Sequence, residues 1–249
     1  MKNKQEEQRK AREQHRQDMR TAKTRLQTQS RPGLDLQPRV GEIQQDKPTI
    51  LIVCGAENTE KSYFEKFRLT SARVQIAKNA VDPISLVNYA NRLRSQNNAE
   101  QVWCIFDKDN IPGIDFDKAI REAKAFGMQV GYSVQAFEYW LILHLENHLG
   151  DPLSRADYDA RLNRFLKPLG TSYDGRASKI ISERFFDILQ ANDPKKGKSY
   201  QQIAIERAKK IHNRCKHKNP SLAESCTTVY ELVEELMKHI QINSAPITK

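Results

Sequence analysis

Two short apolar runs, each followed by acidic residues, constrain the fold of this chain more than any other feature. Thr49–Cys54 is followed by Glu57 in the next loop, and Gln101–Phe106 is followed at once by Asp107 and Asp109. Such runs are typical of strands buried on both faces of a parallel sheet. The carboxyl ends of these strands meet at one edge of the sheet, where ligands bind. The pattern therefore predicts carboxylates that gather at that edge and suit a hard divalent cation such as Mg²⁺.

Further strands and helices alternate around these two runs. Asp82-Pro83 is typical of an N-cap followed by proline at the first helical position, and Gly127 is typical of a C-cap. This regular alternation predicts an α/β fold with a mostly parallel sheet flanked by helices. We expect strands at 49–54, 72–77, 101–106 and 128–133, and helices at about 59–68, 83–95, 115–126 and 137–147.

The sequence divides into three regions. Residues 1–46 are rich in Gln, Arg, Lys and Glu and poor in large apolar residues, which predicts a basic, solvated or disordered tail. Residues 47–150 carry the α/β pattern. Residues 151–249 carry no strand pattern, and we expect a helical extension packed on the α/β domain. Its helices are predicted at about 155–168, 178–190, 198–217 and 227–242.

Basic charge is concentrated in the second half of the chain. The protein has 41 Lys and Arg against 31 Asp and Glu, and residues 155–218 alone hold 16 against 7. Segregated positive charge favours a polyanionic partner such as nucleic acid, although many of these side chains would also simply solvate outer helix faces. The residues predicted to contact nucleic acid are Arg164, Lys167, Arg176, Lys179, Lys196 and Lys198.

Cysteine usage and hydropathy bear on where such a chain works. Four cysteines, two of them inside predicted buried strands, do not form a disulfide framework and favour a reducing cytoplasm. No stretch approaches the roughly 20 apolar residues of a membrane span, so we expect a cytoplasmic protein without a membrane partner. His212, Cys215, His217 and Cys226 match no standard zinc spacing.

Each acidic candidate also has an ordinary structural interpretation. Asp107 and Asp109 can solvate a turn at a strand end. Glu138 can be a first-turn glutamate of its helix, and so can Glu60, which the helix dipole favours there. Glu57 is the better metal candidate in the first loop, because the loop can direct it inward.

Several separate motifs, in the same order along the chain, resemble the RloB family. They lie at residues 52–64, 82–87, 106–109, 137–141 and 219–233. The first reads Ile-Val-Cys-x-x-Glu-x-Thr-Glu-x-x-Tyr-Phe, the third Phe-Asp-x-Asp and the fourth Phe-Glu-x-Trp-Leu. The resemblance extends from about residue 48 to 240.

The resemblance implies a fold and an activity. RloB-like proteins resemble TOPRIM domains, in which an acid after the first strand and a later Asp-x-Asp hold Mg²⁺ for phosphodiester chemistry. It implies that Asp107 and Asp109, with Glu57, bind Mg²⁺ or Mn²⁺, and that Glu138 is a further catalytic acid. The expected function is a metal-dependent nuclease acting on RNA such as tRNA, or on DNA. The expected setting is anti-phage defence or abortive infection, with an RloA-like ATPase as partner.

One departure from the family pattern concerns the metal site directly. The family usually has Cys-Glu-Gly-Glu-x-Thr-Glu, whereas Gly55 and Ala56 follow Cys54 here, so the first-strand glutamate is absent. Three alternatives remain open: Glu57 replaces it, the site binds metal weakly, or the chain binds nucleic acid without cleaving it. In the last case the protein would be a catalytically degenerate TOPRIM subunit with a regulatory role in a defence complex.

Overall fold

The computed structural model describes residue 17 and residues 48–55, 58–69, 73–78, 82–215 and 219–240. The chain divides into two compact units, Met1–Asp46 and Lys47–Lys249. Apart from Gln17, which is helical, the predicted tail lies outside the described residues. Glu57 lies outside them as well, so its predicted place at the sheet edge stays a prediction.

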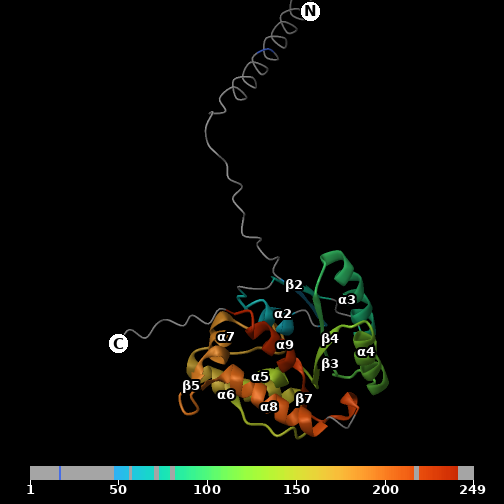
Figure 1. Ribbon diagram of the computed structural model, residues 1–249. Helices are drawn as coiled ribbons and strands as arrows, with labels where there is room; N and C mark the ends of the chain where they lie inside the picture. Colours follow the sequence, from blue (N-terminus) through green and yellow to red (C-terminus); the bar gives the residue numbers. More distant parts are fainter. Residues whose placement is uncertain are drawn as a thin grey trace, which may run out of the picture. The chain divides into compact units, whose positions relative to one another are not determined.

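Strands and helices alternate through the first half of the second unit, and helices predominate in its second half (Figure 1). The elements up to residue 145 are β1 (Thr49–Cys54), α2 (Thr59–Phe64), β2 (Arg73–Lys78), α3 (Pro83–Asn97), β3 (Gln101–Asp107), α4 (Gly113–Ala125), β4 (Gln129–Val134) and α5 (Glu138–Leu145). They are followed by α6 (Arg155–Leu166), η1 (Lys167–Leu169), α7 (Glu183–Gln190), β5 (Asn192–Asp193), β6 (Lys198–Ser199), α8 (Tyr200–Cys215), η2 (Pro220–Leu222), β7 (Cys226–Thr227) and α9 (Val229–Met237).

The central sheet confirms the predicted α/β architecture. Within the described residues its five strands have the order β2-β1-β3-β4-β7, with β1 to β4 parallel and β7 antiparallel to β4. Helices α3 and α4 cover one face, and α2, α5 and α9 lie on the other (Figure 1). Because α2 and α3 leave the sheet on opposite faces, the strand order reverses between β1 and β3. A crevice at the carboxyl ends of these two strands is where such sheets bind ligands.

Local sequence signals explain how the first crossover helices begin and end. The Asp82 side chain accepts a hydrogen bond of 3.0 Å from the Ser85 amide, with Pro83 at the first helical position. Gly127 follows α4 with a φ of +70°, a conformation that glycine adopts without strain. These signals therefore set the ends of the helices that cover one face of the sheet.

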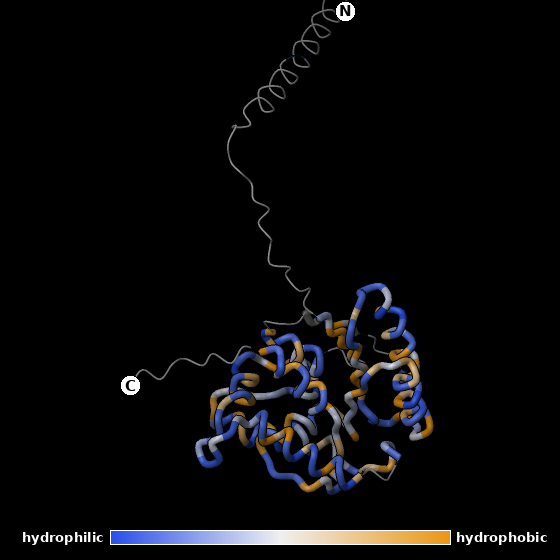
Figure 2. The backbone as a smooth tube through the Cα atoms, in the orientation of Figure 1, coloured by the Kyte–Doolittle hydropathy of each residue, from blue (hydrophilic) through white to orange (hydrophobic). Residues whose placement is uncertain are grey.

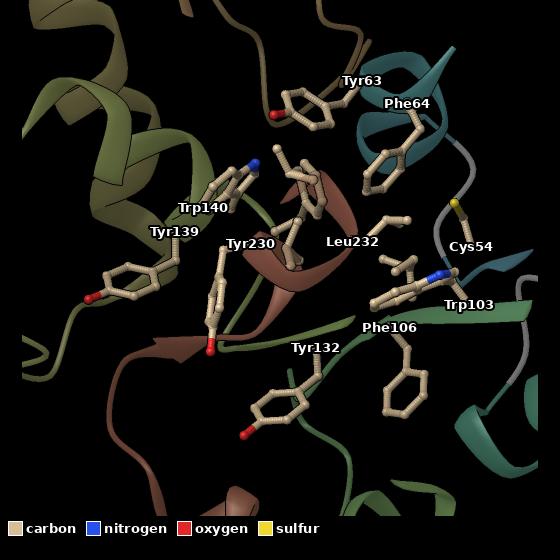
Figure 3. Close-up of a cluster of buried hydrophobic side chains, with 14 of the residues drawn as sticks. Cys54, Tyr63, Phe64, Trp103, Phe106, Tyr132, Tyr139, Trp140, Tyr230 and Leu232 are labelled. Carbon is tan, nitrogen blue, oxygen red and sulfur yellow. The ribbon is translucent and has the colours of Figure 1, made fainter. Parts of the chain in front are cut away.

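The core lies on both faces of the sheet, and its part between the sheet and the helices of the second face is rich in aromatic side chains. Tyr63 and Phe64 of α2, Trp103 of β3 and Leu232 of α9 gather in one buried cluster with Trp140 of α5 (Figure 3). Along the surrounding helices, hydrophobic and hydrophilic residues alternate, as expected for helices with one buried side (Figure 2). The position of α2 in the crevice is thus determined by large apolar side chains.

The prediction that no strand follows Gly150 is wrong. β7 pairs with the end of β4, Thr227 opposite Ser133 and Cys226 opposite Val134. A strand of two residues is too short to produce a detectable periodicity, and its pairing depends on β4, more than ninety residues earlier in the chain. The helix predicted from residue 227 accordingly begins at Val229.

The second half of the chain is attached to the sheet by polar contacts as well as by β7. The buried Asp117 carboxylate of α4 accepts hydrogen bonds from the Ser221 amide (2.9 Å) and hydroxyl (2.7 Å). Arg207 of α8 donates to the carbonyl oxygen of Leu143 at 2.6 Å, at the end of α5.

In the part of the chain that the structure describes, no helix is both long and apolar enough to cross a lipid bilayer.

Candidate acidic site

The loop after β3 is held at the crevice by the loop after β4. The Lys108 amide donates to the Ser133 carbonyl at 2.8 Å, and the Asp109 amide donates to the Gln135 carbonyl at 2.9 Å. The Phe137 amide donates to Asp107 Oδ2 at 3.0 Å. These bonds fix the backbone of the Asp-x-Asp motif and orient the Asp107 carboxylate.

The surroundings of Asp107 strongly disfavour the ionised form of its carboxyl group. Its Oδ1 atom is buried and accepts no hydrogen bond from the described residues. Burial raises the pKa of Asp107 well above its ordinary value, and the charges of Glu60, Glu138 and Asp109 raise it further. The four acids therefore lie close enough to repel one another, so the sheet edge does gather carboxylates as predicted.

Glu60 is the member of this cluster that the sequence interpretation missed. It lies in the first turn of α2 but is only 1% exposed, and its Oε2 atom is buried without a hydrogen-bond partner among the described residues. Burial raises the pKa of Glu60 to about 7, and the Glu138 and Asp109 charges add to the effect. A glutamate that only stabilised a helix start would be solvated. The available signal was spacing, because Glu60 shares a helix face with the buried Tyr63 and Phe64 three and four residues later.

Glu138 is held in the cluster by Tyr173. Glu138 is 5% exposed, at the start of α5, and its Oε1 atom accepts a 2.7 Å hydrogen bond from the Tyr173 hydroxyl. Burial and then the Glu138 charge raise the pKa of Tyr173, which keeps this hydroxyl protonated. The same hydroxyl lies 2.9 Å from Thr59 Oγ1, so it joins α2 to α5. Asn163 of α6 fixes Tyr173 in turn through two 2.8 Å bonds to its backbone amide and carbonyl.

Lys179 provides positive charge to this cluster. Its charge lowers the pKa of Glu60, against the effect of the other acids. Its segment is attached to α2, because Asn58 Nδ2 donates to the Ser178 carbonyl at 3.0 Å and the Ile181 amide donates to Ser62 Oγ at 3.0 Å. Lys179 was predicted only as a nucleic-acid contact, and the structure places it beside the acids.

Two glycines show how tightly the backbone packs around the site. A Cβ atom at Gly55 would lie 3.3 Å from Leu86 Cδ1 and 3.4 Å from the Ile105 carbonyl oxygen. These atoms therefore leave little room for the glutamate side chain that the family usually carries at this position. A Cβ atom at Gly175 would lie 2.3 Å from Asp159 Oδ1. The close approach of Asp159 disfavours any larger residue at Gly175.

The other predicted nucleic-acid contacts fall into two separate groups. Arg164, Lys167 and Arg176 line hollows beside α6 that begin at Glu138. Lys196 and Lys198 belong to the β5–β6 hairpin, where Lys198 forms an ion pair with Glu206 of α8. The structure thus brings the first group next to the acidic site, and it places the hairpin lysines elsewhere.

The donor chemistry of the cluster fits a hard cation. Among the described residues, no group of three or more His, Cys, Asp or Glu side chains is arranged to hold a metal ion. Two buried carboxylate oxygens, on Glu60 and Asp107, nevertheless lack hydrogen-bond partners within the same described ranges. Mg²⁺ accepts only oxygen ligands of this kind, keeps several waters and often binds through one or two carboxylates.

Tyr173→Phe tests the link between the acids and α2. The substitution removes the hydrogen bond to Glu138 and leaves the Thr59 hydroxyl buried without that contact, so we expect the free energy of unfolding to fall by about 1–3 kcal/mol at pH 8. Urea unfolding measures the change. Tyr89→Phe on α3, where the side chain is half-exposed, is the matched control and should change stability by less than about 0.5 kcal/mol. Equal effects of the two substitutions would contradict the assigned role of Tyr173.

The fold and the buried carboxylates define an α/β protein with an acidic site at the switch point of a mostly parallel sheet. The chain belongs to the RloB-like protein family, whose sequence pattern matches residues 50–236. This match includes both the sheet and α9, and it confirms the family resemblance of the sequence motifs. Neither the curated proteins nor the solved structures provide a match to this chain.

Proposed function

We propose that this RloB-like protein is a Mg²⁺-dependent, TOPRIM-type nuclease that hydrolyses phosphodiester bonds in nucleic acid. The single observation that carries the proposal is the cluster of Glu60, Asp107, Asp109 and Glu138 at the switch point of the sheet, in which Glu60 and Glu138 are almost fully buried. Like charges buried together are unfavourable without a neutralising cation, and enzymes retain such arrangements where chemistry needs them.

The position of each residue in the site determines its proposed role. Glu60 and Asp107 carry the unpartnered oxygens and would hold the metal, with Asp109 in the same loop. When bound, the metal would polarise a phosphoryl oxygen and lower the pKa of a bound water. Tyr173 keeps Glu138 oriented, and Lys179 places a positive charge near Glu60, where a phosphate would enter. Glu57, which lies in the sequence between β1 and α2, is a candidate for a further ligand.

The biological setting proposed from the family resemblance is anti-phage defence with an RloA-like ATPase partner. An uncontrolled nuclease would damage its own cell, so we infer that the chain is held inactive until it is released. Co-expression and co-purification of this chain with an RloA-like ATPase would test the partnership.

A catalytically degenerate, nucleic-acid-binding subunit is the second candidate. It is favoured by Gly55 at the position of the usual first-strand glutamate and by the absence of a preassembled metal cluster among the described residues. Both candidates predict affinity for nucleic acid that decreases with salt. Only the nuclease predicts a metal-dependent product.

Incubation of the purified full-length chain with tRNA and with plasmid DNA separates the two candidates. The reactions contain Mg²⁺ or Mn²⁺, with EDTA as the control, and are repeated with the ATPase partner and ATP. Cleavage that EDTA abolishes supports the nuclease. Binding without any metal-dependent product in all of these reactions would favour the degenerate subunit.

A further inference from the structure

Two neighbouring hollows beside α6 share lining residues, and the first of them reaches the acidic site at Glu138; together they are called the α6 trough. The first, of about 320 Å³, is lined by Glu138 and by Tyr158, Asp159 and Arg176. The second, of about 470 Å³, is also lined by Asp159 and Arg176, and it continues to Lys167. Because the two hollows share Asp159 and Arg176, they connect Glu138 with the far end of α6.

The floor of this α6 trough is one stripe of the helix. Ala156, Ala160, Asn163 and Lys167 recur at intervals of three and four residues, so they lie on the same face. The two alanines are exposed and small, which leaves the surface hollow above them. The wall is the segment around Arg176, and the bonds between Asn163 and the Tyr173 backbone hold it against the floor. Tyr173 therefore connects the wall of the trough to Glu138.

The charges along the α6 trough suit a phosphate backbone with bases. Arg176 and Lys167 are exposed, and the Arg164 side chain is 66% exposed although it pairs with Glu146 at 3.2 Å. Asp159 is the one carboxylate among the residues that line both hollows. A phosphate would avoid Asp159, whereas the amino group of a base donates to such a carboxylate.

We propose that the α6 trough binds the single-stranded part of a nucleic acid next to the phosphate that reaches the acidic site, with Arg176 and Lys167 as phosphate contacts. The inference rests on the proposed function, because it assigns the path by which a substrate strand enters the same site. Hollows of this size fall in the lower part of the range for ligand pockets, about 300–1,000 Å³. Glu60 and Glu138 are only 1% and 5% exposed, so we expect a separated strand to bring a phosphate to them more readily than a wide, stacked duplex would.

Equilibrium binding in EDTA tests the proposal without any turnover. Fluorescence anisotropy with labelled single-stranded RNA, single-stranded DNA and duplex of equal length gives the dissociation constants. For the double variant Arg176→Glu/Lys167→Glu we expect at least an approximately tenfold weaker affinity for single strands, and a flatter dependence of log Kd on log salt.

A matched variant on the opposite face of the sheet controls for net charge. Arg121→Glu/Lys124→Glu makes the same charge change on α4, where both side chains are exposed, and should alter affinity less than about threefold. Thermal melting of all variants shows that each is folded. An equal loss of affinity in the two double variants would contradict the proposed role of the α6 trough, and so would duplex binding as tight as single-strand binding.

The outcomes also separate this inference from the proposed activity. A chain that binds single strands through Arg176 and Lys167 but yields no product with Mg²⁺ or Mn²⁺ supports the trough and refutes the nuclease. A chain that cleaves, with unchanged affinity in Arg176→Glu/Lys167→Glu, supports the nuclease and refutes the trough. A preference between RNA and DNA strands would identify which nucleic acid the trough accepts.

Discussion

Asp107→Asn is expected to reduce metal-dependent cleavage by at least about 10²–10³-fold while increasing the stability of the metal-free protein. Loss of one preorganised electrostatic group in an active site has an effect of this size on the rate. The asparagine oxygen can still accept the Phe137 amide hydrogen bond, so the loop should keep its conformation. Removing the charge relieves the cost of burying it and its repulsion by Glu60 and Glu138, so we expect a higher free energy of unfolding.

Two measurements check this prediction. Initial cleavage rates with Mg²⁺ give the loss of activity, and urea unfolding in EDTA at pH 8 gives the change in stability. Asp187→Asn on α7 removes an exposed carboxylate and should change neither quantity appreciably. If Asp107→Asn retained the full rate, Asp107 would not be a metal ligand. If it instead unfolded the chain, the charge would have a structural partner that the acidic cluster does not explain.

Glu60→Gln is expected to remove a large pH dependence of stability in the metal-free protein. The pKa of Glu60 rises from 4.5 to about 7 on folding, so the folded protein binds its proton more tightly than the unfolded chain. Stability therefore falls as the pH rises from about 4.5 to 7, and the full loss persists above pH 7. A shift of this size corresponds to about 3 kcal/mol, and glutamine avoids this loss because it carries no charge.

Urea unfolding between pH 5 and 8 in EDTA measures this difference. The wild-type chain should lose about 3 kcal/mol more than Glu60→Gln over this range, and Glu100→Gln, at an exposed position, should behave like the wild type. Mg²⁺ at pH 8 should raise the melting temperature of the wild type but have much less effect on Glu60→Gln. Parallel pH profiles for wild type and Glu60→Gln would exclude the assigned environment of Glu60.

Much of the fold follows from local pattern. The strand predicted at 49–54 has those bounds, and the other three predicted strands agree with β2, β3 and β4 to within one residue at each end. β1 and β3 are predictable because they contain continuous apolar runs, and β2 and β4 because apolar residues recur at every second position between predicted helices. β7 is not predictable in this way, since its two residues form a strand only through their partner, β4. α2 ends at Phe64 rather than near residue 68, because its length depends on packing of Tyr63 and Phe64 rather than on the pattern.

The location of the acidic site was predictable from the sequence, but the full set of residues that form it was not. Asp107 and Asp109 follow a strand directly, so topology alone puts them at the sheet edge. The contribution of Glu60 depends on the burial of its helix face, and the proximity of Lys179 depends on a segment more than a hundred residues away in sequence. Such long-range proximity has no local signal. The predicted catalytic roles of Glu57 and Glu138 stay predictions, as do the roles of the hairpin residues Lys196 and Lys198.

The antiparallel strand β7 has a consequence for how this protein can be divided or recombined. β4 would be an open sheet edge without Cys226 and Thr227, and α9, which follows at once, covers the adjoining face. An unprotected edge strand promotes pairing with other molecules. Removal of the segment from Cys226 onward would therefore expose β4 as a pairing edge, so the parallel strands and the β7–α9 segment have to be kept together in any truncated or recombined form of this protein.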